Sequence, residues 1–596
     1  MPISGLAPAT APTDAAAALP PPAWTSAACI AVAFPTLLAF NLPPSATFFN
    51  QAAAFIGWGV WASLLAWSGI PAGRPWRGGA RALLAALALL ALAAGVAPLS
   101  SGLPWSLALS ALGTLAAAAL LVVLGVALTR GGLAPAAFHS LSVALLVAGV
   151  LGAVIGVVQV FVPQWTDGSV VAQISGGRAA GNLRQPNHLS SLLLWSLVAL
   201  AWLAERGRVG RFATPALGAL LLAGIVLSAS RTGMLGVLML GAWGLLDRRL
   251  SRRSRTLLLA SPFVFALLWS GLGAWAHHSQ QVFGGDAQLA KGDISSSRFG
   301  IWANTLTLIA RHPWFGVGWG EFNFAWTLTP FPDRPVAFFD HTHNLPLQFA
   351  VELGLPLALL VLALLGWALW RAARAGFGAG HESADPATSL TLRAAFLMVL
   401  MMAVHSQLEY PLWYAHFLLP TAFAFGLCLG SGGPPPAAAA RGSSGSWPLR
   451  IGAPLLLIGS VAAVYDYSRV VAIFAPGEHA PPLAERIADG QRSWLFSHHA
   501  DYAAVTTAEH VPDPTHAFAR VPHYLLDTRL MMAWARALEE DGQPDAARHV
   551  AQRLREFRNE QAEPFFEVCE LLPDETGAVP FQCQAPTRQL DYQDFR

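Results

Sequence analysis

Three short polar segments of an otherwise apolar chain carry arginines that could bind an anion. The first has the sequence RAAGNLRQPNH and includes Arg184, Gln185 and Asn187. The second, SASRTG, holds Arg231, and the third, SSSR, ends at Arg298. Arginine binds phosphate groups through paired, charge-assisted hydrogen bonds and keeps its charge at physiological pH. These segments predict an anion site; the alternatives are a solvated loop, an arginine that reaches a membrane surface, and an arginine beside a helix cap.

Two further polar segments carry histidine, glutamate and tyrosine. DHTHN ends at His343 and Asn344, and HSQLEYPLWY contains Glu409 and Tyr410. Histidine is the usual general base near neutral pH, and a nearby carboxylate or amide would hold its ring. His341 and His343 are spaced i, i+2, which does not place two rings on one helix face, and no third ligand stands at metal spacing. We therefore expect no metal, and we expect the ring of His341 to point elsewhere.

The composition indicates what kind of scaffold must position these residues. The chain has 596 residues, of which 54% are hydrophobic and only 12% are charged, whereas about 25% is typical of soluble domains. Its uncharged stretches are long enough to cross a bilayer as helices. The net charge of +2 provides no basic surface for nucleic acid. The sequence predicts an all-α, polytopic membrane bundle with no nucleic-acid partner.

Apolar windows predict thirteen membrane-spanning helices. They lie at about 26–43, 51–70, 80–98, 106–129, 139–162, 188–204, 212–228, 232–247, 256–276, 344–370, 390–407, 411–430 and 451–467. Residues 1–24 are rich in alanine and proline, lack the basic region of a cleaved signal peptide, and are expected to be disordered and cytoplasmic. The transmembrane part then covers residues 25–468, and residues 469–596 form a C-terminal domain.

The loops show on which side of the membrane the polar segments lie. Arginines follow the even-numbered windows: Arg74, Arg77, Arg81, Arg130, Arg206, Arg208, Arg211, Arg248, Arg249, Arg252, Arg253, Arg255, Arg371, Arg374, Arg393, Arg441 and Arg450. Basic loops stay in the cytoplasm, so the long loops 163–187 and 277–343 and the C-terminal domain face outward. All five polar segments fall on that outer side. Arginines and a histidine base at the outer leaflet indicate transfer from a lipid-linked diphosphate.

Parts of the outer side are expected to be helical. Ser297–Arg311 has apolar residues at helical spacing, which is typical of an amphipathic helix on the membrane surface or over the bundle. Ala533–Leu554 has the pattern of one tetratricopeptide-like hairpin, too little to indicate a repeat array. Cys569 and Cys583 are the two cysteines outside the membrane, and we expect a disulfide between them; two unpaired thiols are the alternative.

At these segments the sequence resembles the bacterial O-antigen ligase and polymerase superfamily of membrane glycosyltransferases. The matching blocks are GNLRQPNHLSSLL, SASRTG, SRFGIWANTLTLIARHPWFGVGWGEF and HTHNLPLQFAVELGLPL. The block HSQLEYPLWYAHFLLP, followed by one more window and a polar tail, resembles the protein O-oligosaccharyltransferase branch, of the pilin-glycosylation type. The blocks cover most of residues 140–430.

The resemblance implies a reaction. A glycan would pass from undecaprenyl diphosphate to a serine or threonine hydroxyl of a periplasmic or pilin-like protein, at the outer face of the bacterial inner membrane. The transfer would invert the anomeric centre and use no metal or other cofactor. His343 matches the residue taken as the base, while Arg231 and Arg298 match arginines assigned to the donor diphosphate. Arg184 is expected to assist these two arginines.

The resemblance also implies supporting residues. Gln185 matches a glutamine of the first-loop motif and is placed with the donor-binding group. Tyr410 lies in the last motif, where Tyr414 is an equally plausible match. The remaining residues expected to support the site are Asn187, Asn344 and Glu409.

Three other functions remain open at this point. O-antigen ligases, which act on lipid A-core, and O-antigen polymerases share the donor and differ in the acceptor. The long polar tail at residues 469–596 favours the protein transferase. A transporter or flippase would show matching halves and ionisable residues near mid-membrane, whereas here the polar segments gather on one face.

The topology can be tested with fusions. We expect alkaline phosphatase to be active when fused after Tyr467 and inactive when fused within the loop near residue 250, because it matures only outside the cytoplasm. Enzymatic activity of the two fusions, at matched protein level, is the measurement. The reverse pattern would overturn the sidedness of every loop.

Overall fold

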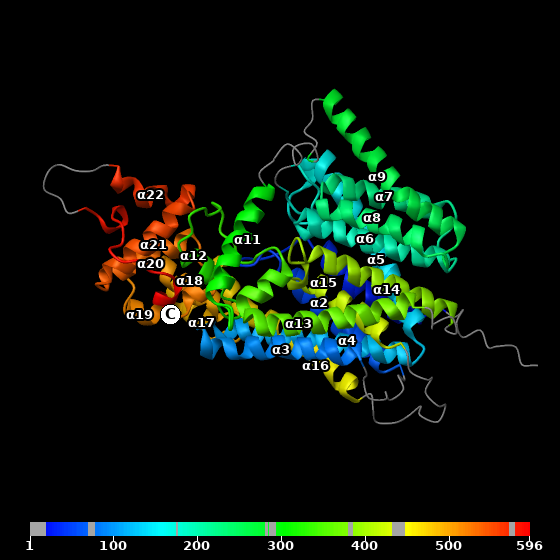
Figure 1. Ribbon diagram of the computed structural model, residues 1–596, viewed down its shortest axis with the longest axis horizontal. Coiled ribbons are helices and arrows are strands. Elements are labelled where there is room, and N and C mark those ends of the chain that lie inside the picture. Colours follow the sequence, from blue (N-terminus) through cyan, green and yellow to red (C-terminus); the bar gives the residue numbers. More distant parts are fainter. Residues whose placement is uncertain are drawn as a thin grey trace, which may run out of the picture.

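The computed structural model describes residues 19–68, 78–174, 177–279, 284, 294–378, 385–431, 447–570 and 579–596 (Figure 1). Every regular element within these ranges is a helix, which confirms the predicted all-α fold. Apolar, uncharged segments form helices in lipid because a helix pairs all its backbone N–H and C=O groups within the segment. Residues 1–18, Arg74, Arg77 and Arg441, which entered the topology prediction, lie outside the described residues.

Each of the thirteen predicted windows coincides with a helix. These helices are α1 (Pro22–Leu37), α2 (Phe48–Ala66), α3 (Gly79–Ser100), α4 (Trp105–Arg130), α5 (Ala134–Phe161), α6 (Pro186–Glu205), α7 (Ala213–Ser228), α8 (Arg231–Leu246), α9 (Arg252–Ser279), α13 (Leu345–Phe377), α14 (Pro386–His405), α15 (Ala415–Leu429) and α16 (Trp447–Phe474). Within the described ranges, eight helices are long and apolar enough to cross a membrane, and α1, α7, α8 and α15 are shorter apolar helices. Thirteen spans therefore stays a prediction. Residues 22–24, expected to be disordered, already belong to α1.

Helix α6 is the central element of the bundle. Of its most apolar 18-residue window 89% is buried, more than in any other long apolar helix described. It contacts α5, α7, α8 and α14. Its two tryptophans donate across to α14, Trp195 to the carbonyl of Met398 (3.1 Å) and Trp202 to the hydroxyl of Thr391 (3.2 Å). Because α6 begins at the polar segment RQPNH, its burial fixes that segment relative to the bundle.

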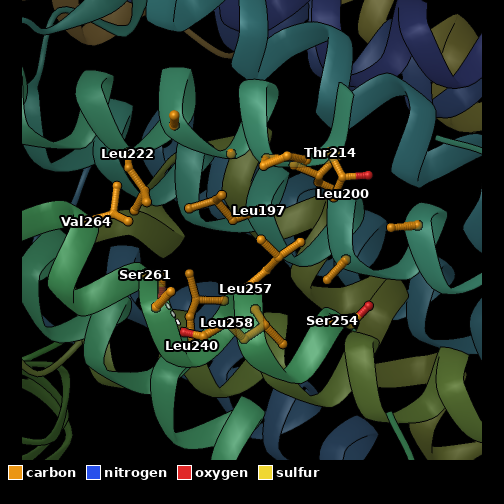
Figure 2. Close-up of a pocket in the computed structure, with 16 residues that line it drawn as sticks. Leu197, Leu200, Thr214, Leu222, Leu240, Ser254, Leu257, Leu258, Ser261 and Val264 are labelled. Carbon is orange, nitrogen blue, oxygen red and sulfur yellow. Dashed lines mark hydrogen bonds between the residues drawn. The ribbon is translucent and has the colours of Figure 1, made fainter. Parts of the chain in front are cut away.

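An apolar cavity of about 140 Å³ lies between α6, α7, α8 and α9. Figure 2 shows that leucines such as Leu197, Leu222, Leu240 and Leu258 line it. Its lining contains no charged side chain. The cavity is formed by the ends of these helices that lie away from the polar segments. It is therefore not the candidate site.

Helix α13 is bent near its start. Gly354 has φ 75°, a backbone conformation that glycine adopts freely and other residues avoid. The bend exposes two carbonyls, and the carbonyls of Val351 and Glu352 accept hydrogen bonds from the backbone N–H of Val317 (2.7 Å) and of Gly318 (3.1 Å). The bend therefore docks the loop that follows α11 (Ile294–Arg311) against α13.

The C-terminal domain is helical, as predicted. It contains α17 (Leu483–Gly490), α18 (Ser497–Thr507), α19 (Pro514–Ala517), α20 (Thr528–Glu540), α21 (Pro544–Glu556) and α22 (Glu563–Phe566). Helices α20 and α21 form the predicted hairpin, and the disulfide between Cys569 and Cys583 is present. Helix α16 continues to Phe474, beyond the predicted domain boundary at residue 469.

The C-terminal domain shares a hydrophobic core with the second long loop (Figure 1). The loop contains the predicted amphipathic helix as α11, and also α12 (Phe322–Leu328). Helix α12 packs against α21, and α11 packs against α12 and α13. The apolar side chains of these helices form one core with those of α20; it includes Ile301, Leu308, Phe322, Trp326, Leu530, Trp534, Val550, Leu554 and Phe557. The domain is therefore part of the structure that holds the loop.

Buried polar contacts reinforce this shared core. Glu321 is fully buried and accepts a hydrogen bond from His523 Nδ1 at 2.7 Å. The side-chain oxygen of Asn323 accepts one from the N–H of Leu526 (2.7 Å). Burial raises the pKa of Glu321, and the hydrogen bond and charge of His523 oppose that rise. A carboxylate removed from water in this way needs its partner.

We expect His523→Ala to lower the free energy of unfolding by about 1–3 kcal/mol, because it leaves the Glu321 carboxyl buried without its donor. Thermal unfolding of the full chain in detergent, with release of the C-terminal domain by limited proteolysis as a second readout, measures the effect. His510→Ala is the matched control: His510 also contacts a carboxylate, that of Glu540 at 2.9 Å, but the histidine side chain is 72% exposed. Equal shifts in the two variants would contradict the structural role of His523.

Candidate active site

The carboxylate of Glu409 is the meeting point of the predicted polar segments. It lies in the loop between α14 and α15 and is 5% exposed. Its Oε1 accepts hydrogen bonds from Arg298 and from the amide of Asn187 (3.0 Å), and its Oε2 lies 2.9 Å from Nδ1 of His343. Burial alone would raise the pKa of Glu409, but the hydrogen bond from His343 and the charges of His343 and Arg298 lower it. The group therefore stays ionised in its buried position.

A chain of hydroxyls connects the first two arginine segments to this carboxylate. Ser230 caps α8 by accepting from the N–H of Gly233 (3.0 Å), and its hydroxyl donates to the side-chain oxygen of Asn187 (2.7 Å). Ser190 in turn donates to Ser230 (2.9 Å). The start of α6 and the start of α8 are thus joined, and Arg231 is the first residue of α8.

The two histidines lie side by side. His341 Nε2 is 3.3 Å from His343 Nδ1, and the ring centroids are 4.2 Å apart. The prediction that the His341 ring points elsewhere is therefore wrong. It assumed a helix, whereas residues 341–344 precede α13 and His343 has a left-handed φ of 54°. His341 Nδ1 contacts the carboxylate of Asp340.

Several hydrogen bonds hold this non-helical segment. Asn344 caps α13 by accepting from the N–H of Leu347 (3.0 Å), and its amide donates to the carbonyl of Gln407 (3.1 Å) in the loop that carries Glu409. Trp302 of α11 donates to the carbonyl of Thr342 (2.9 Å). The predicted supporting role of Asn344 thus corresponds to joining the histidine segment to the α14–α15 loop.

Tyr410 rather than Tyr414 lies against the histidines. Its ring centroid is 3.5 Å from that of His341 and 5.8 Å from that of His343. Tyr414 packs on His188, with ring centroids 4.5 Å apart. Burial, with the neighbouring Tyr414 second, raises the pKa of Tyr410, so its hydroxyl stays protonated; a hydrogen bond with Tyr414 contributes to the rise.

Arg178 was not among the predicted site residues, although it opens the first polar segment. Its guanidinium donates to the carbonyls of Ser228 (3.0 Å) and Ala229 (3.2 Å), which end α7 directly before Arg231. Burial and the charge of Arg231 lower the pKa of Arg178, and the charge of Glu409 opposes that shift. Arg231 itself is exposed and donates no hydrogen bond to the described residues. The charge of Arg178 thus interacts both with Arg231 and with Glu409.

Arg184 does not join this cluster. Its guanidinium donates to the carbonyls of Ala46 (3.0 Å) and Ala39 in the loop between α1 and α2. Its prediction as a donor-binding residue is not supported by these contacts. Gln185, the N-cap residue of α6, has a buried side-chain oxygen without a hydrogen-bond partner among the described residues. The side chains of Ser295, Ser296 and Ser297 lie outside the description.

The geometry adds a third possible metal ligand to the two histidines, whereas the expectation that the protein uses no metal stays a prediction. His341, His343 and Glu409 each offer one ligand atom, and these three atoms lie within 4.8 Å of one another. The third ligand, which spacing within DHTHN could not reveal, comes from a loop 66 residues further along the chain. Burial lowers the pKa of His341, with Asp340 opposing, so this imidazole is neutral near pH 7.

The fold and this cluster define a polytopic helical membrane protein whose ionisable side chains meet at one end of the bundle. Three family models match the chain: O-Antigen ligase over residues 216–362; Virulence factor membrane-bound polymerase, C-terminal, over residues 393–565; and Protein glycosylation ligase over residues 179–204. Every site residue predicted from the sequence lies within one of these segments.

Two curated proteins of Acinetobacter baylyi (strain ATCC 33305 / BD413 / ADP1) are similar to this chain. The general O-oligosaccharyltransferase is 28% identical over 265 residues, which are 43% of this chain and 44% of that protein. The ComP-specific O-oligosaccharyltransferase is 26% identical over 261 residues, 42% of this chain and 44% of that protein. The matched region spans less than half the length of either relative. The chain is homologous to these O-oligosaccharyltransferases and to the O-antigen ligase family, which confirms the resemblance.

The two arginines should differ in their effect on stability. Arg298→Ala leaves the buried Glu409 carboxylate without its cation and should lower the free energy of unfolding by about 1–3 kcal/mol. Arg231→Ala removes an exposed side chain and should leave stability close to that of the unchanged protein. Thermal unfolding in the same detergent measures both. An Arg298→Ala variant as stable as the unchanged protein would show that Glu409 does not depend on Arg298.

Proposed function

We propose that the chain transfers a preassembled glycan from undecaprenyl diphosphate to serine or threonine hydroxyls of periplasmic or pilin-like proteins. The observation that carries this proposal is the 2.9 Å contact between His343 Nδ1 and the Glu409 carboxylate, beside Arg298. Through Glu409, this contact brings the proposed base, His343, and the proposed anion-binding residue, Arg298, into one cluster. The protein would lie in the bacterial inner membrane with this cluster facing the periplasm.

The hydrogen bonds determine which nitrogen of His343 acts as the base. Asp340 and Glu409 are carboxylates and only accept hydrogen bonds when ionised. His341 therefore carries its proton on Nδ1, toward Asp340, and leaves a lone pair on Nε2. His343 Nδ1 faces that lone pair and Glu409 Oε2, so it carries the proton. The lone pair of His343 then lies on Nε2, which takes the proton of the acceptor hydroxyl as that hydroxyl attacks the anomeric carbon.

The arginines would stabilise the leaving group. Departure of the glycan places negative charge on the lipid diphosphate, and fixed cations that face this charge lower the barrier. Arg231 is exposed and free to bind phosphate oxygens. Arg298 has further N–H donors besides the one that it gives to Glu409. Arg178 would hold the turn that carries Arg231. No step requires a metal, and inversion follows from a single displacement.

The comparisons favour one class of acceptor for the glycan. Both curated relatives are named as O-oligosaccharyltransferases, and one name specifies ComP, which favours a protein acceptor. The match to the O-antigen ligase model keeps transfer to lipid A-core as the second candidate, and the match of residues 393–565 to a polymerase model keeps glycan polymerisation as a third.

Mass spectrometry of periplasmic proteins from cells with and without this chain tests the proposal. Glycopeptides should be present only with the chain, whereas loss of long-chain lipopolysaccharide alone would indicate the ligase.

His343→Ala should reduce glycopeptide formation by a factor of about 10²–10⁴, the usual effect of removing a general base. His341→Ala should be milder, because it removes only a second acceptor from His343 Nδ1. His510→Ala, on the exposed surface of the C-terminal domain, is the control and should match the unchanged protein. Quantified glycopeptides at equal membrane levels of each variant are the measurement. Greater damage from His341→Ala than from His343→Ala would contradict the assignment of the base.

A further inference from the structure

Single ligand atoms of His341, His343 and Glu409 lie within 4.8 Å of one another, close enough to bind one metal ion together. His341 Nε2 and His343 Nδ1 are 3.3 Å apart, and His343 Nδ1 and Glu409 Oε2 are 2.9 Å apart. Nitrogen and oxygen ligands about 2.0–2.1 Å from a tetrahedral zinc ion lie about 3.3 Å from each other. The first distance equals that value, and the second requires a small outward movement of the carboxylate.

The groups around these ligands also fit a metal. Asp340 accepts from Nδ1 of His341, which fixes the tautomer with the Nε2 lone pair toward the cluster; a carboxylate behind a ligating histidine is a recurrent feature of zinc sites. Arg298 and Asn187 both bind Oε1 of Glu409, so neither donates to Oε2. Two imidazoles and one carboxylate suit zinc and its neighbours, whereas Mg²⁺ and Ca²⁺ prefer oxygen ligands throughout.

We propose that His341 Nε2, His343 Nδ1 and Glu409 Oε2 form an inhibitory site for Zn²⁺, with a water molecule as the fourth ligand. Binding moves the proton of His343 from Nδ1 to Nε2, so the imidazole stays neutral and zinc takes the place of that proton. His343 Nε2 then carries a proton and has no lone pair for the acceptor hydroxyl. The inhibition rests on the proposed function; the binding does not.

The nearby positive charges set the strength of this site. Arg298 contacts the same carboxylate, and the charge of Arg178 also interacts with Glu409. Both cations oppose a divalent ion at this position. We therefore expect the bound zinc to exchange with free zinc in solution and to be removed by EDTA, unlike a permanently bound structural ion.

Direct binding is measured on the purified full chain in detergent with ZnCl₂ alone. After equilibrium dialysis against ZnCl₂, elemental analysis should find one zinc ion per chain in excess of the free zinc, and zinc should raise the unfolding temperature. Asp340→Asn should weaken binding by about 10–100-fold, the usual effect of losing a carboxylate behind a ligating histidine. His341→Ala should abolish both the retained zinc and the rise in unfolding temperature, and His510→Ala should keep both. Equal zinc retention by the unchanged chain and His341→Ala would overturn the site.

Transfer activity provides the second readout. Zinc should stop glycan transfer by the unchanged chain, EDTA should restore it, and Mg²⁺ at the same concentration should have no effect. His341→Ala should need more than about 100-fold more zinc for the same fractional inhibition, because it removes a ligand and not only the carboxylate behind it. Equal sensitivity would mean that zinc acts only on the donor diphosphate and would overturn the inhibition. Zinc binding that depends on His341, in a chain that transfers no glycan even without zinc, would refute the proposed function and leave the site intact.

Discussion

One buried carboxylate organises the polar end of this protein. Glu409 is ionised and almost out of water, so it is stable only when donors surround it. Those donors, Arg298, Asn187 and His343, come from three separate parts of the chain, and Glu409 supplies a fourth. The hydrogen bonds that stabilise this charge are therefore the same contacts that hold the residues of the candidate site together. The serine chain through Ser230 extends the assembly to the start of α8.

The helices around the carboxylate fix its donors in position. Asn187 lies in the first turn of α6, which is the most buried of the long helices and is tied to α14 by its tryptophans. Arg298 lies on α11, which packs against α12 and α13 and whose following loop docks in the bend of α13 at Gly354. Rigid elements thus stand behind each group that contacts Glu409, which is what a preorganised electrostatic site requires.

The sequence was sufficient to locate the helices and the polar segments, because hydropathy and residue type are local properties. The sequence was not sufficient to predict which way the polar side chains point and which groups they contact. Arg184 and Arg178 flank the same short motif, yet the first binds carbonyls between α1 and α2 and the second binds the end of α7. The positive φ of His343, which turns two histidines toward each other, depends on contacts with Gln407 and Trp302 that no spacing rule shows. The Glu321–His523 pair joins residues 202 positions apart and was equally invisible.

The shared core of the second long loop and the C-terminal domain has a consequence for biogenesis. Residues 294–343 emerge from the insertion machinery before α13, α14, α15 and α16, and α12 meets its partner α21 only when residues 544–556 arrive. Until then, the core that contains Phe322 and Trp326 lacks the side chains of α20 and α21. Exposed apolar segments of this kind attract chaperones and proteases. Arrival of the C-terminal domain beside this loop is therefore the step that commits the newly made chain to its folded form, and quality control acts during the interval before it.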